Sequence, residues 1–209
     1  MSIDHTCFVS YPHPGKEGSY LDVFVQDLIA ELDERLDGFL PGNVYWDKPR
    51  LKATYDYDVA LSQAICRSTC MIVIYCPEYA RREYCRREFD LMNRINERRR
   101  GSLGMATDKQ HFIALVSLAQ RKLLPQRLQS TSWHVADFSS YMTLPNNSKR
   151  RIRASKALRE NVQGLATAVQ ELHGLIGGRG AFGSSELCCG EAIGNPDSVP
   201  EWEPAPFPR

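Results

Sequence analysis

The sequence predicts an α/β fold in which helices cover both faces of a parallel sheet. Short apolar runs of strand length alternate along the chain with longer segments of helical periodicity, the order found in parallel βαβ units. The apolar runs are rich in β-branched and aromatic residues and lack polar alternation, as expected for strands that are buried on both faces.

Composition fits one globular domain with a core of ordinary size. The chain has 209 residues, of which 43% are hydrophobic and 24% charged. Lys and Arg total 26 and Asp and Glu total 25, a formal net charge of +1. This balance does not favour nucleic acid or an anionic membrane as an obligatory partner, so we expect neither.

The first third of the chain contains two predicted strands and one helix. Residues 6–11 (TCFVSY) form a first strand, followed by loop chemistry with two prolines and two glycines. Residues 20–36 carry apolar side chains at steps of three and four, which predicts a helix with an acidic outer face. Residues 44–46 open a short second strand that ends before Asp47, and residues 48–56 read as a solvent-facing loop.

The middle of the chain contains the segment that most directly suggests a function. Residues 57–68 predict a helix, and residues 70–76 (CMIVIYC) predict a buried strand. From Glu78 helix formers continue to about Arg99, so we expect a single helix there.

The last third completes the alternation. Residues 111–118 (HFIALVSL) and 133–138 (WHVADF) predict strands, with a loop or short helix between them. Residues 154–176 place apolar side chains at steps of three and four, which predicts a long final helix. Residues 177–209 are rich in Gly, Pro and Ser, so we expect a flexible tail with Trp202 and Phe207 as docking points.

Glu88 has two interpretations. Tyr84, Glu88 and Leu91 follow at spacings of four and three, so they share one helix face that is otherwise aromatic and aliphatic. A carboxylate there either reaches solvent or pairs with Arg81 or Arg87, or it belongs to a site beyond the carboxyl end of a parallel strand. Spacing alone does not choose between them.

The remaining sequence features exclude several classes of site. The N-terminus lacks a signal-peptide pattern, and no apolar run approaches the length of a membrane-spanning helix. The 7 cysteines lie mostly in apolar segments without metal-type spacing, which favours small hydrophobic side chains in a reducing cytoplasm and no metal site. Phosphate-binding glycine motifs and hydrolase triads are also missing from the sequence.

Several of these segments together resemble the Toll/interleukin receptor (TIR) domain family. The match consists of a first strand ending in CFVSY, a second ending in WD before a basic loop with a proline, and the segment ALSQAICRSTCMIVIYCPEYARREYCRREF. The resemblance covers residues 1–176, and the chain looks more like the bacterial members than like animal receptors. It implies a flavodoxin-like three-layer sandwich with five parallel strands.

The resemblance also implies an activity. Enzymatic members of this family cleave the bond between nicotinamide and ribose in NAD, as NAD glycohydrolases or ADP-ribosyl cyclases. Their catalytic Glu lies in an aromatic-Cys-x-x-Glu pattern, which matches Glu88 here. NAD is then the substrate, and no cofactor is implied. Family loops also imply contacts to the nucleotide, which give the substrate-binding candidates Ser10, Tyr11, His13, Trp46, Asp47, Lys48, Arg50, Tyr84 and Cys85.

Two departures from the family pattern stand in this sequence. Tyr84 occupies the position where Trp is frequent, and Arg50 follows Pro49 where the family often has Gly. Members without activity supply an alternative, a non-catalytic module that acts by self-association through residues 48–54 and the helices. The enzyme interpretation implies bacterial antiphage defence, self-association into TIR assemblies and a separate effector protein that binds the product.

Overall fold

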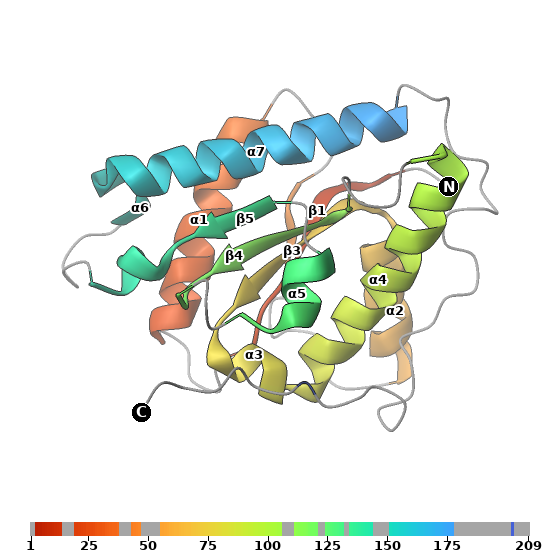
Figure 1. Cartoon of the computed structure of the whole chain (residues 1–209), viewed down its shortest axis with the longest axis horizontal. Helices are drawn as coiled ribbons and strands as arrows, with labels where there is room; N and C mark the ends of the chain where they lie inside the picture. The colour runs from red at the N-terminus through yellow and green to blue at the C-terminus, as the bar shows by residue number, and fades with distance from the viewer. Residues whose placement is uncertain are drawn as a thin grey trace.

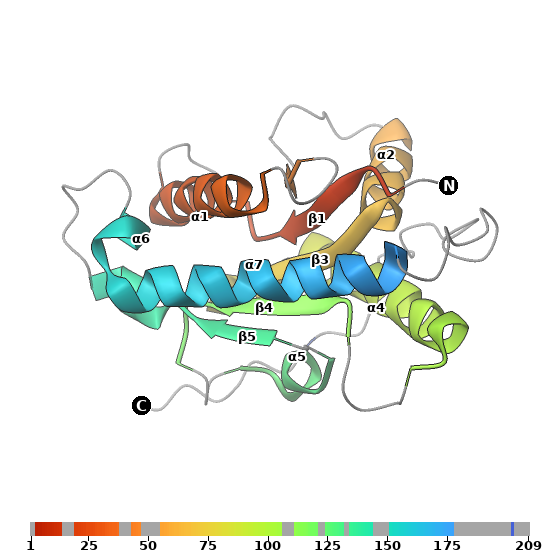
Figure 2. The ribbon, with the colours of Figure 1, turned by 90° about the horizontal axis from the view of Figure 1, so that it is seen from above.

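The computed structural model describes residues 3–13, 19–37, 43–46, 55–105, 111–120, 124–131, 134–143, 151–177 and 202. The described chain forms one sheet with helices on both faces (Figures 1 and 2). The strands are β1 His5–Ser10, β2 Tyr45–Trp46, β3 Ser68–Tyr75, β4 Ile113–Ser117 and β5 His134–Asp137.

The five strands are all parallel and lie in the order β2-β1-β3-β4-β5. The chain therefore reverses its direction of travel across the sheet between β1 and β3, and their carboxyl ends lie side by side there. Both the parallel sheet and the flavodoxin-like order confirm the fold class expected from the sequence.

All eight residues of β3 are buried, which confirms the prediction of a strand covered on both faces. Its neighbours β1 and β4 are buried at every position except the half-buried His5. Exposing an apolar strand to water on either face costs free energy. Strands β1, β3 and β4 therefore require helices on both faces of the sheet.

Helices α1 Tyr20–Leu36, α6 Arg151–Ala154 and α7 Lys156–Gly177 pack against one another, and α7 runs across β1, β3 and β5 (Figures 1 and 2). Helix α2 Tyr55–Cys66 packs against α4 Glu83–Leu103, and both contact the sheet from the other face. The short helix α5 Gln126–Thr131 is joined to α4 by an ion pair between Arg127 and Asp90, with 2.7 Å between nitrogen and oxygen.

The single helix expected from Glu78 to Arg99 is wrong in one respect. The chain forms a five-residue helix, α3 Pro77–Arg81, and then restarts as α4 after Arg82, whose backbone is extended at φ −82° and ψ 110°. The Tyr79 ring is completely buried, and the break lets α3 direct this ring inward while α4 takes its own direction. Helix propensity did not reveal the break because the burial of Tyr79 is a tertiary effect.

The final helix expected over residues 154–176 is observed as α7, Lys156–Gly177, and the short helix α6 directly precedes it. Ser155 separates α6 from α7, and its backbone carbonyl and hydroxyl accept the amides of Arg159 and Leu158. The 3-10 helix Ser139–Thr143 follows β5.

The cysteines are not all alike. Cys7, Cys70, Cys76 and Cys85 are free, and three of them are buried, in agreement with a role as small hydrophobic side chains. Cys66, at the end of α2, is disulfide-bonded, so that expectation is wrong for this residue. Cys188 and Cys189 lie outside the described residues.

Candidate active site

Glu88 is anchored at the carboxyl edge of the sheet. It lies in the second turn of α4 and is 4% exposed, so its side chain does not reach solvent. The hydroxyl of Ser10, the last residue of β1, donates to Glu88 Oε2 over 2.5 Å. The contact joins residues 78 positions apart and places the carboxylate beside the strand end. The Glu88 carboxylate therefore lies at a strand end, as the second interpretation requires, and its role as a site residue stays a prediction.

Tyr79 extends this contact into a chain of hydrogen bonds. Its phenol oxygen lies 2.8 Å from Ser10 Oγ and donates over 3.2 Å to the backbone carbonyl of Cys85. The proton of Ser10 is directed to Glu88, so the proton of Tyr79 serves both Ser10 and the Cys85 carbonyl. We call Tyr79, Ser10 and Glu88 the hydroxyl relay below. It ties α3, β1 and α4 together at one point.

The relay lies in a site of low polarity. Burial raises the pKa of Tyr79 well above its ordinary value, and the nearby Glu88 carboxylate raises it further. Tyr79 therefore stays protonated and keeps the proton that it donates. Burial, and then the charge of Glu88, also raise the pKa of the Cys85 thiol. Cys85 is consequently a neutral thiol and not a nucleophile at neutral pH.

Tyr84 and Cys85 flank the relay in different ways. Cys85 is 3% exposed, and it is its backbone carbonyl that contacts Tyr79. Tyr84 is half-buried, and the Arg87 guanidinium lies 5.8 Å from its ring centroid. Arg87 also forms an ion pair of 3.0 Å with Asp58 of α2. The expectation that Tyr84 and Cys85 contact the nucleotide stays a prediction.

Other predicted residues lie along the same edge of the sheet. Tyr11 and His13 follow β1, with their rings 4.5 Å apart and tilted by 53°. Trp46 ends β2 and pairs with Val9 of β1, one residue before Ser10. The sheet thus brings the ends of β1 and β2 together. The remaining predicted contacts lie outside the described residues: Asp47, Lys48 and Arg50.

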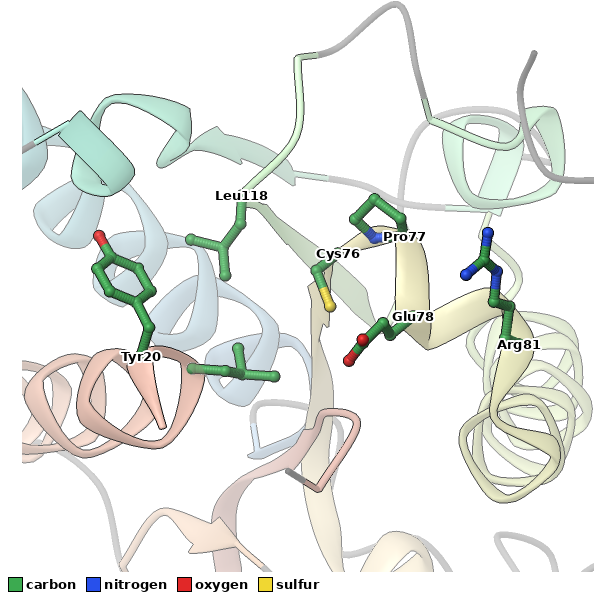
Figure 3. A pocket seen from close by; sticks show the side chains of 7 residues that line it. Tyr20, Cys76, Pro77, Glu78, Arg81 and Leu118 are labelled. Carbon is green, nitrogen blue, oxygen red and sulfur yellow. The ribbon is translucent and has the colours of Figure 1, made fainter. Parts of the chain in front are cut away.

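A cavity of about 410 Å³ opens at the carboxyl ends of β3 and β4 (Figure 3). Its walls come from the start of α1, the β3–α3 junction and the residue after β4, and are largely apolar. The lining residues are Tyr20, Leu21, Cys76, Pro77, Glu78, Arg81 and Leu118. Glu78 lines the cavity, and Tyr79, the next residue, belongs to the relay, so the two features share the first turn of α3.

Sequence reasoning missed Tyr79 and the cavity residues. Glu78 and Pro77 were visible only as the start of a helix, and Leu118 as the end of a strand. The one signal for Tyr79 was an aromatic residue in an otherwise charged first turn directly after a buried strand. Its contact with Ser10 depends on strand order, which the sequence does not specify by itself.

The described residues contain no group of three or more His, Cys, Asp or Glu side chains placed to hold a metal ion. Within the same part of the chain, no helix is long and apolar enough to cross a membrane.

Comparison with known proteins adds little to this picture. No family model and no curated protein matches the chain. Solved structures that match include "Structure of the activated Roq1 resistosome directly recognizing the pathogen effector XopQ (TIR domains)", which is 17% identical. That match covers 77% of this chain and 82% of the other, with a TM-score of 0.40.

The strand order, the parallel pairing and the helices on both faces define an α/β protein of flavodoxin-like topology. Its candidate site is a buried carboxylate that accepts a hydrogen bond from the Ser10 hydroxyl at the point where the strand order reverses.

Proposed function

We propose that this protein is a TIR-type enzyme that cleaves the bond between nicotinamide and ribose in NAD, with Glu88 as the essential carboxylate. The observation that carries the proposal is the contact of Glu88 with Ser10 at the carboxyl end of β1. Open α/β sheets bind ligands at this edge, where the strand order reverses. The aromatic-Cys-x-x-Glu pattern places the same residue in the catalytic position by resemblance.

The chemistry requires one well-placed carboxylate. Cleavage of the N-glycosidic bond develops positive charge on the ribose, as in other glycosyl transfers. Nicotinamide is cationic before cleavage and leaves as a neutral molecule, so no general acid is needed. A carboxylate beside the ribose stabilises the developing cation, and an apolar surround strengthens that interaction by lowering the effective dielectric.

The hydroxyl relay suits this role. Ser10 fixes the orientation of the carboxylate through Oε2, and in the proposed mechanism this oriented carboxylate faces the ribose hydroxyls and the developing cation. Burial raises the pKa of both Tyr79 and Cys85, which keeps these two groups neutral, and in the proposed mechanism Glu88 supplies the negative charge. Substrate contact requires that Glu88, 4% exposed here, becomes accessible when NAD binds.

The released ADP-ribose leaves as a linear, cyclic or conjugated product that a separate effector protein reads, in bacterial antiphage defence. Activity depends on self-association, in which residues 48–54 of one copy complete the cleft of the next. These parts of the proposal come from the family resemblance alone.

The test is nicotinamide release from NAD, followed by chromatography with concentrated protein. Wild type releases nicotinamide, Glu88→Gln does not, and Glu160→Gln, the same chemical change on an exposed position of α7, behaves as wild type. Equal release by Glu88→Gln and wild type would remove Glu88 from the mechanism.

A non-catalytic, self-associating module is the second candidate. The low exposure of Glu88 favours it, since a buried carboxylate with a hydroxyl donor also occurs as a structural element. In that case Glu88→Gln changes the thermal midpoint, while neither protein releases nicotinamide at any concentration tested.

A further inference from the structure

Trp202, near the C-terminus, packs against the Tyr79 ring of the hydroxyl relay. It is 7% exposed and belongs to the hydrophobic core, although it lies 25 residues beyond the end of α7. The sequence placed it in the tail as a docking point, and Phe207, the other one, lies outside the described residues.

The Trp202 ring contacts both helices that build the candidate site. Its centroid lies 5.9 Å from that of Tyr79 in α3, with the rings tilted by 39°. It lies 5.0 Å from the centroid of Phe89 in α4, nearly perpendicular at 83°. Phe89 directly follows Glu88, so Trp202 touches a relay member on one side and the neighbour of the carboxylate on the other.

A cation completes this aromatic cluster. The Arg127 guanidinium of α5 lies 5.9 Å from the Trp202 centroid and 5.8 Å from that of Phe89. Arg127 is held in turn by Asp90, two residues after Glu88. Cation–π contact with Trp is the most favourable of its kind, so Arg127 helps to hold the indole in place.

We infer that Trp202 is a positioning residue for Glu88, acting through the Tyr79 ring. This inference rests on the proposed function. Tyr79 has no freedom to move its hydroxyl without moving its ring, because the phenol oxygen lies on the ring axis. The indole fills the space beside that ring, so it fixes the distance from Tyr79 to Ser10 and, through Ser10, the orientation of the Glu88 carboxylate.

Because Trp202 is buried among aromatic rings, its removal should affect the position of the Tyr79 ring directly. Replacing Trp202 by Ala leaves a space next to two aromatic rings that are otherwise 0% exposed. Tyr79 can then shift, and small shifts of a catalytic group have large effects on rate because the reacting geometry is narrow. We expect substrate binding to be affected much less, because Trp202 contacts Tyr79, Phe89 and Arg127, which are not among the predicted substrate-binding residues.

The experiment compares steady-state nicotinamide release by wild type, Trp202→Ala, Trp202→Phe and Val169→Ala. For Trp202→Ala we expect kcat to fall about tenfold or more with KM within about twofold, because positioning is lost and binding is kept. Trp202→Phe keeps an aromatic ring and restores most of kcat. Val169→Ala removes buried volume from α7, on the other face of the sheet, and leaves kcat unchanged.

A double-mutant cycle with Tyr79→Phe separates positioning from general stability. If Trp202 acts through the Tyr79 hydroxyl, Trp202→Ala has almost no further effect on kcat once that hydroxyl is gone. Two results would overturn the inference: effects of the two substitutions on kcat that multiply independently, or an unchanged kcat in Trp202→Ala. In either case, Glu88-dependent release by the wild type would still support the proposed function. No release by wild type refutes the proposed function itself, so the two failures are distinguishable.

Discussion

At the scale of single residues, the site is defined by hydroxyl groups more than by charges. Glu88 Oε2 receives its short hydrogen bond from a neutral Ser10, whose oxygen is in turn 2.8 Å from the neutral Tyr79. A neutral donor orients a carboxylate without cancelling its charge, which leaves that charge to act on a cationic substrate.

Ser10→Ala tests this arrangement. Removal of the hydroxyl leaves a buried carboxylate oxygen without its donor, so we expect the free energy of unfolding to fall by about 1–3 kcal/mol. We also expect a fall in kcat of about tenfold, because the carboxylate loses its orientation. Denaturant unfolding and nicotinamide release measure the two effects.

Ser68→Ala is the matched control for Ser10. Ser68 is equally buried and donates over 2.7 Å to the Ala64 carbonyl, but it lies at the opposite, amino end of β3. It should lose stability and keep kcat. A similar loss of kcat in both variants would show that the rate only follows stability.

At the scale of secondary-structure elements, buried Arg99 joins α4 to the end of α2. Its guanidinium is 0% exposed and donates to the carbonyls of Cys66 and Thr69 over 2.8 and 2.7 Å. The Cys66 carbonyl belongs to the end of α2, where carbonyls lack helical partners and a positive charge is favoured. Burial lowers the pKa of Arg99 to about 10, so it remains charged at neutral pH.

Arg99→Met keeps the apolar stem and removes both donors. We expect the free energy of unfolding to fall by about 2–4 kcal/mol, since two buried carbonyls lose their partner. Arg98→Met, the same change at the adjacent, exposed position, should cost less than about 0.5 kcal/mol. Urea unfolding followed by circular dichroism compares them, and equal costs would contradict this role of Arg99.

A second link between elements depends on pH. Glu31 of α1 is 2% exposed and binds Arg35 over 2.7 Å, and it also forms an ion pair with Arg153 of α6. Burial by itself raises the pKa of Glu31, but the two guanidinium groups outweigh it and hold the pKa below the ordinary value of 4.5. A lowered folded-state pKa means stability that is present above pH 4.5 and lost as pH falls through the folded-state pKa.

Glu31→Gln should therefore destabilise the protein by about 1–3 kcal/mol at pH 7 and by much less once Glu31 is protonated in the wild type. Thermal unfolding of both proteins between pH 7 and acid conditions measures the difference. Glu34→Gln is the control. The Glu34 side chain is 61% exposed and also pairs with Arg153, so its replacement should have a small effect on stability at every pH tested. A deficit for Glu31→Gln that persists unchanged into acid would contradict the ion-pair explanation.

Elements were predictable from the sequence to different degrees. The buried strand expected over residues 70–76 is observed as β3, Ser68–Tyr75, because a run of mostly apolar residues without charge has few alternatives in a domain of this composition. The break at Arg82 was not predictable, since it depends on where the Tyr79 ring is buried. Likewise, helical spacing put Glu88 on an apolar face, but only the adjacency of β1 and β3 brings Ser10 to it.

At the scale of the whole molecule, strand order creates the site. Ser10 and Tyr79 come from the ends of segments on either side of the reversal between β1 and β3, and Glu88 approaches from α4. The cavity at the start of α3 is lined by Glu78, the residue before Tyr79. The alternation of strands and helices in the sequence predicted a parallel sheet, and the family resemblance predicted the order of its strands. The contact of Trp202 with the site could not be predicted, because the only signal in the sequence was an aromatic residue in the tail.

Self-association predicts that activity depends on concentration. When the protein is diluted about a hundredfold, we expect nicotinamide release per molecule to fall, because an assembly dissociates by mass action. Release measured against protein concentration, with sedimentation of the same samples, tests this. Constant activity per molecule across the dilution would show that one copy contains the complete site.

Whether the carboxylate of Glu88 acts on NAD is measured by kcat of Glu88→Gln at saturating NAD. Glutamine preserves the shape and one acceptor oxygen while removing the charge, so we expect kcat to fall at least about 100-fold with the fold intact by circular dichroism. Nicotinamide release by Glu88→Gln at the wild-type rate would refute a catalytic role, and the buried carboxylate would then be a structural part of the sheet edge.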